Sequence, residues 1–579
     1  MTSNEPRVVV IGAGLAGIST GIALKQQLNC KNFTIYEKAN NVGGTWRDNT
    51  YPGCGSDVPG HWYSLSTELN PHWSTYFAGQ PELQAYWEGL FHKHGLVAHT
   101  QFNTLYKSAV WDADAQLYRI VLEDSITGTK IETQAHAIVF AMGGFARGMY
   151  PPEIRGRDVF KGAIWHSAEW DHGYVLEGKR VGVIGNGCSV AQFLPKIAAD
   201  PTVQVVNFCR TPQWFIPAVN SKYPGWVQTL FAYVPGVMRL YRNIIMARSD
   251  TASLAFRKEN TFVLKQARKG FTKYLKSKLP KEMLEKMTPS YPPGCKRIIV
   301  DVGYLDALQQ PNVTVNWDGI DSIVEGGIKT KTGEVIDLDA IIFGTGYVVE
   351  MGNMNILGRN GRTVEGYYAE RGGPTAYLGT CIPGFPNVFT LLGPNTATGH
   401  ASVIFTEEAQ INLAVQLLQP ILEGKAKSFE VTDAATNKYD EWLQRRLATS
   451  VWTECHSYYQ SQNNYDEGSK SELEAKPRIV ATFPGPVSYL WWMLRKPVWG
   501  DYIAVGAEPW FASMRSARRK NAVMLSVVSA LLGVAVGVSL LRADELSASV
   551  GFADVWERVL GLIYPKFMTE ITALRRILC

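Results

Sequence analysis

Residues 7–17 read RVVVIGAGLAG, a short β-branched run followed by a glycine turn and a segment that can begin a helix. In this context Gly12 permits a tight turn, and Gly14 lets the backbone approach a pyrophosphate. Gly17 allows the helix to pack closely on the strand. The N-terminus of that helix would then face the phosphate charge. The stretch therefore predicts a Rossmann-like dinucleotide-binding domain near the start of the chain.

The same pattern occurs a second time further along the chain. Residues 180–187 read RVGVIGNG, so Gly185 and Gly187 take the places of the first two glycines. Val190 stands where the first copy has its third glycine. Because that glycine serves helix packing rather than phosphate contact, we expect a wider helix crossing and not the loss of the site. We interpret Gly185, Gly187 and Ser189 as contacts to a second dinucleotide.

The residue that follows the second strand of each copy differs in charge. Glu37 lies 23 residues after Gly14, and Arg210, followed by Thr211, lies 23 residues after Gly187. A carboxylate at this place can accept hydrogen bonds from both ribose hydroxyls of FAD, whereas a guanidinium suits the extra phosphate of NADPH. The sequence thus predicts FAD in the first site and NADPH in the second, with contacts from Arg210 and Thr211. The alternative is that Arg210 is a solvated surface charge.

The bulk composition is that of a globular protein. The chain has 579 residues, of which 46% are hydrophobic and 19% charged, and its net charge is +5. This length suffices for two or three domains with buried cores. We see no dense basic stripe in the folded part, which argues against nucleic-acid binding. The eight cysteines are scattered singly and without metal-ligand spacing, which predicts free thiols in a reducing compartment and no metal site.

Two longer patterns surround the glycine motifs. Residues 160–171, FKGAIWHSAEWD, fit FxGxxxHxxxW(P/D), and residues 43–57 fit GGxWxxxxYPGxxxD. With both patterns the chain resembles the Baeyer–Villiger monooxygenases over roughly residues 5–500. The resemblance implies an enzyme that takes a hydride from NADPH, captures dioxygen as a flavin 4a-peroxide, and converts a small apolar ketone to an ester or lactone. Secondary metabolism would be a fitting setting.

The longer pattern also suggests which residues lie beside the flavin. The glycine pair ending at Gly44 lets the backbone run close to the ring, and Trp46 offers an aromatic wall. The resemblance places Asp57 at the reactive face, where it holds an arginine. The predicted contacts on this side are Gly44, Thr45, Trp46, Tyr51 and Asp57.

The arginine is found in the segment Cys295-Lys296-Arg297, directly before a strand-like run. By resemblance, Arg297 is catalytic together with Asp57, and Lys296 helps to bind the NADPH 2′-phosphate. A permanently protonated guanidinium suits the stabilisation of developing negative charge where water is excluded. The alternative is a basic pair at the edge of a strand.

Three further residues concern positioning or packing rather than chemistry, and a fourth concerns the substrate. We expect His166 and Trp170 to position the NADP domain, and His400 to pack or form hydrogen bonds rather than act as an acid or base. Tyr458 stands where the family commonly has a tryptophan, so the family's substrate range cannot be carried over.

We therefore expect an α/β fold with two Rossmann-like domains, a helical insertion and a membrane-associated tail. The FAD domain is assigned to residues 1–150 and 348–500, and the NADP domain to 151–347. The insertion is assigned to residues 222–293 and the tail to 501–579. The sequence leaves the oligomeric state open.

The tail contains an apolar segment. Residues 522–541 carry no charge, and four basic residues precede them at positions 515, 518, 519 and 520. This predicts a single-pass transmembrane helix that keeps the catalytic part in the cytosol. In a eukaryotic cell the endoplasmic reticulum would be a suitable membrane. The alternative is a buried core helix.

Three other functions are compatible with two dinucleotide motifs. A flavin-containing monooxygenase would oxygenate sulfur or nitrogen with the same cofactors. A disulfide-type reductase would need a cysteine pair near the flavin, and Cys54 stands alone in its segment. A non-catalytic anchored flavoprotein would bind FAD without being reduced by NADPH.

Overall fold

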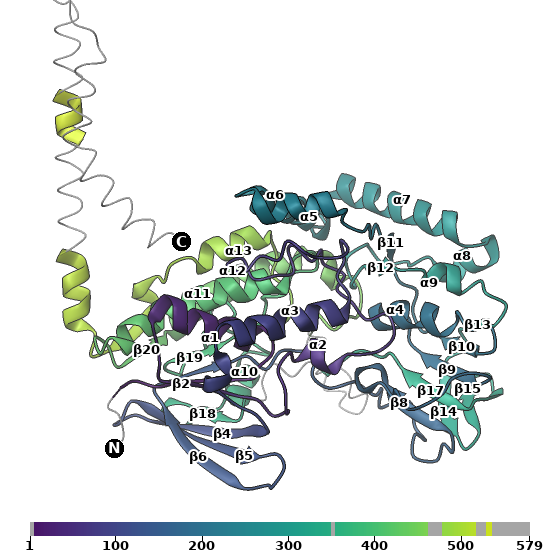
Figure 1. The fold of residues 1–579 in the computed structure, drawn as a ribbon, viewed down its shortest axis with the longest axis horizontal. Helices are drawn as coiled ribbons and strands as arrows, with labels where there is room; N and C mark the ends of the chain where they lie inside the picture. Colours follow the sequence, from purple (N-terminus) through teal and green to yellow (C-terminus); the bar gives the residue numbers. More distant parts are fainter. Residues whose placement is uncertain (1–4, 349–353, 461–477, 517–528, 535–579) are drawn as a thin grey trace, which may run out of the picture. The chain divides into compact units, whose positions relative to one another are not determined.

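The computed structural model describes residues 5–348, 354–460, 478–516 and 529–534. The chain divides into two compact units, residues 1–507 and 508–579. Two five-stranded parallel sheets organise the first unit (Figure 1). The protein is therefore a mixed α/β fold, as the two glycine motifs predict.

The first sheet contains the first glycine motif. Its strand order is β19-β7-β1-β2-β3, with every neighbouring pair parallel. All four residues of β1 are buried, as in a parallel sheet covered on both faces. The strands are β1 (Val8–Ile11), β2 (Phe33–Tyr36), β3 (Thr100–Gln101), β7 (Ala137–Phe140) and β19 (Val388–Thr390).

The second sheet contains the second glycine motif. Its order is β13-β10-β9-β17-β8, again parallel throughout. In both sheets the strand before the glycine turn lies between the next strand and a later, fully buried strand of four residues. The strands are β8 (Ala163–His166), β9 (Arg180–Ile184), β10 (Gln204–Phe208), β13 (Val313–Asn316) and β17 (Ala340–Phe343).

Smaller sheets flank these two. One contains β4 (Thr104–Asp112), β5 (Leu117–Asp124), β6 (Lys130–Ala135) and β18 (Ile356–Leu357). A second contains β14 (Ile320–Val324), β15 (Gly327–Thr330) and β16 (Val335–Asp337). Two pairs complete the set: β11 (Phe215–Pro217) with β12 (Ile299–Asp301), and β20 (Ser428–Val431) with β21 (Tyr502–Val505).

Helices cover the sheets, and four of them form a separate group. The helices outside this group are α1 (Leu15–Leu28), α2 (Thr45–Asp48), α3 (Gln80–Lys93), α4 (Cys188–Ile197), α9 (Tyr304–Ala307), α10 (Val364–Glu370), α11 (Val403–Leu422), α12 (Asp433–Ala448) and α13 (Val487–Leu494). The group itself consists of α5 (Gly225–Tyr233), α6 (Val237–Thr251), α7 (Thr261–Lys278) and α8 (Lys281–Met287), within the segment predicted as a helical insertion. In Figure 1 these helices lie along one side of the first unit, away from both sheets.

The second unit is described only in part. Residues 508–516 and 529–534 are helical. Among the residues that the structure describes, no helix combines the length and apolar character needed to span a membrane. The predicted segment 522–541 lies outside the described residues except for 529–534.

One expectation about the cysteines is wrong. Cys295 and Cys455 form a disulfide, with their Cα atoms 6.1 Å apart. The two residues are 160 positions apart in the sequence, so only the fold brings them together. Five other cysteines, at positions 30, 54, 188, 209 and 381, are free thiols as expected.

Candidate active site

The first glycine turn forms a cradle made of backbone. Gly12 has a φ of +103°, and a Cβ there would lie 2.6 Å from the carbonyl oxygen of Ala141. A Cβ on Gly17 would lie only 1.9 Å from the Gly12 oxygen. Gly14 faces Gly44, and a Cβ on Gly14 would lie 3.7 Å from the Cα of Gly44. No side chain caps the N-terminus of α1. Its backbone N–H groups therefore suit a pyrophosphate.

The second glycine turn repeats this geometry. Gly185 has a φ of +111°, and a Cβ there would lie 2.6 Å from the carbonyl oxygen of Gly344. A Cβ on Gly187 would meet no atom within 4 Å, so the cradle is open. No side chain caps α4, which begins with Cys188 and Ser189. This turn also fits a dinucleotide phosphate.

Glu37 lies directly after β2, where its predicted role requires it. Its Oε2 accepts a hydrogen bond from Ala13 N at 2.7 Å, and its Oε1 accepts one from Ala39 N at 3.0 Å and one from Arg47 at 3.2 Å. The carboxylate is buried. A carboxylate has about four acceptor positions, so Oε2 retains room for a ribose hydroxyl.

Arg210 and Lys296 lie near each other at the second site. Arg210 is exposed and pairs with Glu153 at 3.0 Å, while the Thr211 carbonyl accepts a hydrogen bond from Asn186 at 2.8 Å. Burial, and then the charge of Arg210, lowers the pKa of Lys296. Two neighbouring cations of this kind suit a phosphate group.

The segment predicted to lie beside the flavin joins the two sheets. Thr45 and Trp46 begin α2, and Trp46 is buried edge-on against Tyr63 with ring centroids 5.6 Å apart. The Tyr51 hydroxyl donates to Gln192 of α4 at 2.9 Å, and Gln192 in turn donates to the Gly55 carbonyl at 2.9 Å. Tyr51 therefore fixes this segment to the helix of the second glycine motif.

Asp57 and Arg297, separated by 240 residues in the sequence, form an ion pair. One oxygen, Oδ2, accepts from Arg297 Nη2 at 2.6 Å and from Nε at 3.1 Å. Arg297 Nη1 donates to the Gly399 carbonyl at 3.2 Å. The negative charge of Asp57 raises the pKa of Arg297 well above its usual value. The guanidinium is thus held by two acceptors, Asp57 Oδ2 and the Gly399 carbonyl, and is permanently charged.

The disulfide lies next to this pair. Cys295 is two residues before Arg297, and Cys455 is three residues before Tyr458. Tyr458 and Tyr459 interact electrostatically with Arg297. Tyr458 is the residue that replaces the family's tryptophan. The disulfide therefore holds the segment that contains Tyr458 beside the Asp57–Arg297 pair.

Sequence reasoning missed Glu407 and Tyr63. Glu407 is buried on α11, and its Oε2 has no hydrogen-bond partner among the described residues. Burial, followed by the charge of Glu408, raises the pKa of Glu407 to about 8. Tyr63 interacts with Glu407, Asp57 and Arg297. No local motif marks either residue, because their environment comes from segments distant in the sequence.

Among the described residues, the three side chains expected to position or pack form no hydrogen bond with Arg297. His166 is fully buried, its Nδ1 accepts from Ala168 N at 3.0 Å, and burial lowers its pKa to about 4. Trp170 packs against Phe193 of α4 with centroids 5.2 Å apart. His400 contacts Asp250 at 3.3 Å.

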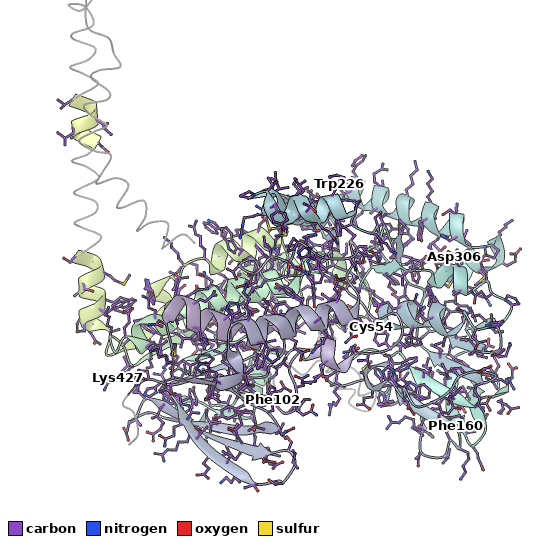
Figure 2. The ribbon with its side chains drawn as sticks, viewed as in Figure 1. Cys54, Phe102, Phe160, Trp226, Asp306 and Lys427 are labelled. Carbon is purple, nitrogen blue, oxygen red and sulfur yellow. A yellow bond between two sulfur atoms is a disulfide. The ribbon has the colours of Figure 1, made fainter. Side chains whose placement is uncertain are left out.

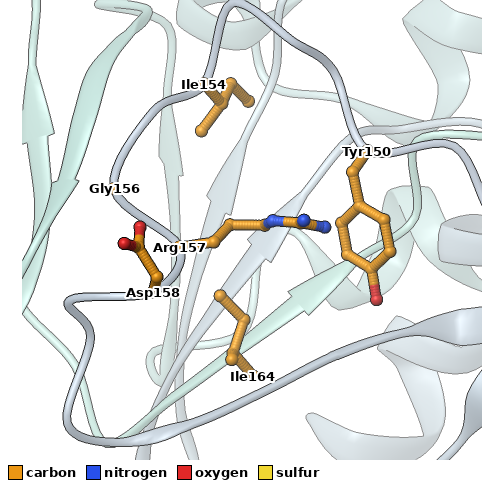
Figure 3. Close-up of a pocket in the computed structure, with 6 residues that line it drawn as sticks. All are labelled: Tyr150, Ile154, Gly156, Arg157, Asp158 and Ile164. Atoms are coloured by element: carbon orange, nitrogen blue, oxygen red, sulfur yellow. The ribbon is translucent and has the colours of Figure 1, made fainter.

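A separate surface hollow of about 460 Å³ lies outside this site (Figure 3). Arg157 extends over the ring of Tyr150, 3.9 Å from its centroid. None of the predicted site residues lines this hollow. We assign it no part in the chemistry.

Comparisons with known proteins agree with this geometry. A family model described as an NAD(P)-binding Rossmann-like domain matches residues 10–79. A Baeyer–Villiger monooxygenase from Pseudomonas aeruginosa is 37% identical over 78% of this chain and 85% of that protein. The FAD-binding monooxygenase ktnD from Aspergillus niger is 31% identical over 91% of this chain and 87% of its own length.

Solved structures of monooxygenases have a similar fold. An oxidised steroid monooxygenase bound to NADP has a TM-score of 0.72 and 26% identity, covering 86% of this chain and 99% of its own. A closed structure of cyclohexanone monooxygenase has a TM-score of 0.74 and 24% identity, with 86% and 98% covered, and shows the likeness of the fold.

The fold and the site define a protein with two Rossmann-like glycine turns and a charged pair, Asp57–Arg297, next to the second of them. The chain belongs to the Baeyer–Villiger monooxygenase family. The relatives do not favour the heteroatom-oxygenating alternative.

Proposed function

We propose that this protein oxidises an apolar ketone to an ester or lactone, using FAD, NADPH and dioxygen. The reaction consumes ketone, O₂, NADPH and a proton, and yields the ester, water and NADP⁺. The observation that carries the proposal is the Asp57–Arg297 pair, with both side chains only about one quarter exposed. The pair lies next to the second glycine turn, since Cys188 at the start of α4 interacts with both partners.

The first cradle would hold FAD. The N-terminus of α1 and the Gly12–Gly14 backbone would receive the pyrophosphate, and Glu37 would accept from a ribose hydroxyl. When bound, the flavin accepts a hydride from NADPH and activates dioxygen.

The second cradle would hold NADPH. Arg210 and Lys296 would bind the 2′-phosphate, with Arg210 exchanging its exposed partner Glu153 for the phosphate. Because the Arg210–Glu153 pair is exposed, this exchange costs little.

Arg297 would stabilise the negative charge that develops on oxygen as the ketone carbonyl is attacked. Asp57 and the Gly399 carbonyl fix the orientation of the guanidinium before the reaction, so no reorganisation is needed when the charge appears. Its raised pKa keeps the charge present across the whole working range of pH.

The variant Arg297→Ala tests this role. We expect the purified variant to keep its flavin absorbance and to be reduced by NADPH, while ester formation falls by a factor of about 100–1,000. Arg297→Lys, which keeps the charge without the fork, should retain part of the activity. Undiminished ester formation in Arg297→Ala would refute the assignment.

A rapid-mixing experiment tests the class of reaction. The NADPH-reduced holoprotein is mixed with dioxygen, and the flavin spectrum is followed. We expect a transient absorbance that belongs neither to reduced nor to oxidised flavin, and then ester from a ketone rather than sulfoxide from a thioether. Prompt return to oxidised flavin would instead favour a reductase.

We further propose that residues 522–541 anchor the protein as a single pass, with the catalytic part in the cytosol and, in a eukaryote, at the endoplasmic reticulum. The support is the uncharged twenty-residue run and the basic residues before it. The full chain should resist extraction from membranes by alkaline carbonate, whereas a chain ending at Ala507 should be released. Retention of the shorter chain after carbonate would exclude this anchor.

A further inference from the structure

The outer side of the helical insertion exposes large apolar side chains. On α5, Trp226 is 71% exposed and Tyr233 is 81% exposed, with Leu230 between them. On α6, Leu240 is 60% exposed and Ile244 is 55% exposed. Both sets follow the i, i+4 or i, i+3 spacing of a single helix face. Figure 2 labels Trp226 at the edge of the molecule.

These outer faces are not the packing faces of the helices. Other side chains of these helices face the protein: Phe231 of α5 and Tyr241 of α6 pack around His61, with ring centroids 4.8 and 5.3 Å from the imidazole, and Ile245 of α6 is buried. Burial lowers the pKa of His61 to about 4, which is typical of an apolar interior. The insertion therefore has an apolar inner face in contact with the protein and a second apolar face in solvent.

Helix α7 adds a stripe of positive charge. Lys265, Lys269, Lys273 and Lys276 are exposed at spacings that place them on one face with Phe262, which is 71% exposed. Among the described residues no ion pair engages these four lysines. These lysines are three or four residues apart in the sequence, so the helix places them on one face.

The helical insertion as a whole is strongly basic. Between Lys222 and Leu279 the sequence has twelve basic and two acidic residues. One of the two acids, Asp250, is occupied by His400 and by the backbone N–H groups of Val487 and Ser488. Two copies of such a face would repel each other, which argues against a dimer through it.

We infer that this outer face, defined here as Trp226, Leu230, Tyr233, Leu240, Ile244, Phe262 and the four lysines of α7, docks on a bilayer that contains anionic lipid. Exposed Trp and Tyr suit the interface between headgroups and acyl chains, and lysines attract anionic headgroups. An exposed apolar patch of this kind is otherwise costly for a protein in solution.

The inner side of the same insertion lies next to the Asp57–Arg297 pair. Phe256, which follows α6, packs against His400 with centroids 5.5 Å apart. A Cβ on Gly399 would lie 3.2 Å from Phe256, and the Gly399 carbonyl holds Arg297. Docking would thus bring the lipid phase, in which an apolar substrate dissolves, close to the site. The docking itself does not depend on the proposed activity.

The test uses the full chain with a fluorescent amino acid placed by codon reassignment, one position at a time. Positions 226 and 262 lie in the outer face, and positions 126 and 175, which are 75% and 68% exposed, serve as controls elsewhere. Vesicles of phosphatidylcholine with phosphatidylserine are added. We expect a blue shift at 226 and 262 only, weakened by salt and by omission of phosphatidylserine.

A charge variant separates this surface from the C-terminal segment. Lys265→Glu, Lys269→Glu and Lys273→Glu together should weaken the vesicle-induced shift on the order of 100-fold in lipid concentration. The matched control, Lys31→Glu, Lys161→Glu and Lys331→Glu, has the same net charge but should leave the shift unchanged.

Three outcomes would overturn the inference. Vesicle binding without a shift at 226 or 262 would assign attachment to the tail alone. A shift that depends on protein concentration without vesicles would indicate a second copy, and a shift with RNA but not with vesicles would indicate nucleic acid. None of these bears on ester formation, so the proposed function is tested separately.

Discussion

The two glycine turns of this protein have nearly the same backbone and opposite chemistry. Gly12 and Gly185 have φ values of +103° and +111°, and a Cβ on either would lie 2.6 Å from a carbonyl oxygen of the neighbouring strand's end. After the next strand, however, one site has the buried carboxylate Glu37 and the other the exposed guanidinium Arg210. The comparison teaches that the backbone provides a phosphate cradle, while one side chain selects the dinucleotide.

The turns also differ in how they make room for the helix. In the first, Gly17 lies against the Gly12 carbonyl, and Ala141 follows the end of β7. In the second, Val190 replaces the helix glycine, and Gly344 follows the end of β17. A Cβ on Gly344 would lie 2.2 Å from Val190 Cγ2. The first motif thus has its glycine in the helix, at Gly17, whereas the second has it after the neighbouring strand, at Gly344. This explains how the second motif tolerates valine at position 190.

The largest expected effect comes from closing one cradle at a time. Gly12→Ala should abolish FAD retention, whereas Gly185→Ala should keep FAD but lose reduction by NADPH, because each alanine combines an unfavourable φ with a clash. Flavin absorbance after purification and single-turnover reduction measure the two losses. Loss of FAD in both variants would mean that the cradles are not independent.

The next effect tests the exchange of small residues. Gly344→Ala should destabilise the protein by about 1–3 kcal/mol through overpacking, and Val190→Ala in the same chain should restore part of that loss. Apparent Tm of the single and double variants is the measurement. Ala141→Gly is the matched change in the first motif and should create no clash to be rescued. Additive effects of the two substitutions would contradict the proposed contact.

A smaller effect tests the charge contrast. Arg210→Ala should raise the KM for NADPH about 10–100-fold, with little change in kcat or in the KM for NADH, since only the 2′-phosphate contact is lost. Steady-state kinetics with both nucleotides measure this. Arg157→Ala removes another exposed arginine, which lies over Tyr150, and should leave both constants unchanged. An equal rise in KM for NADPH and for NADH would show that Arg210 does not contact the 2′-phosphate.

The smallest expected effect is on the pH dependence of stability, and it contrasts two buried carboxyl groups, Glu37 and Glu407. Glu37 has three donors, whereas Glu407 has an unpartnered oxygen and a pKa of about 8 in the fold, against 4.5 as its ordinary value. Between these pH values unfolding releases a proton, so Glu407 lowers stability progressively as pH rises from 4.5 to 8.

Glu407→Gln removes this dependence. The variant should match the parent near pH 5 and exceed its apparent Tm by a few degrees above pH 8. Glu408→Gln is the control, because it removes the negative charge that pairs with the buried Arg242 at 3.3 Å and should lower Tm. A constant difference between Glu407→Gln and the parent across pH would contradict the raised pKa.

Local patterns predicted much of this molecule. Glycine turns specify a strand–turn–helix unit through steric demands that act within a few residues, so both cradles and the charge after each second strand could be predicted. The Asp57–Arg297 pair was predicted only through resemblance to a family, since 240 residues separate the partners. Glu407, Tyr63 and the disulfide had no local signal at all.

The sequence by itself determined the two dinucleotide motifs, their opposite charges and the membership of a monooxygenase family. Only the tertiary structure decided which distant residues share an environment. It joined Cys295 to Cys455 and gave Val190 its space at Gly344. The physical reason is that steric limits on the backbone act over a few residues, whereas burial, ion pairing and disulfide formation depend on three-dimensional proximity.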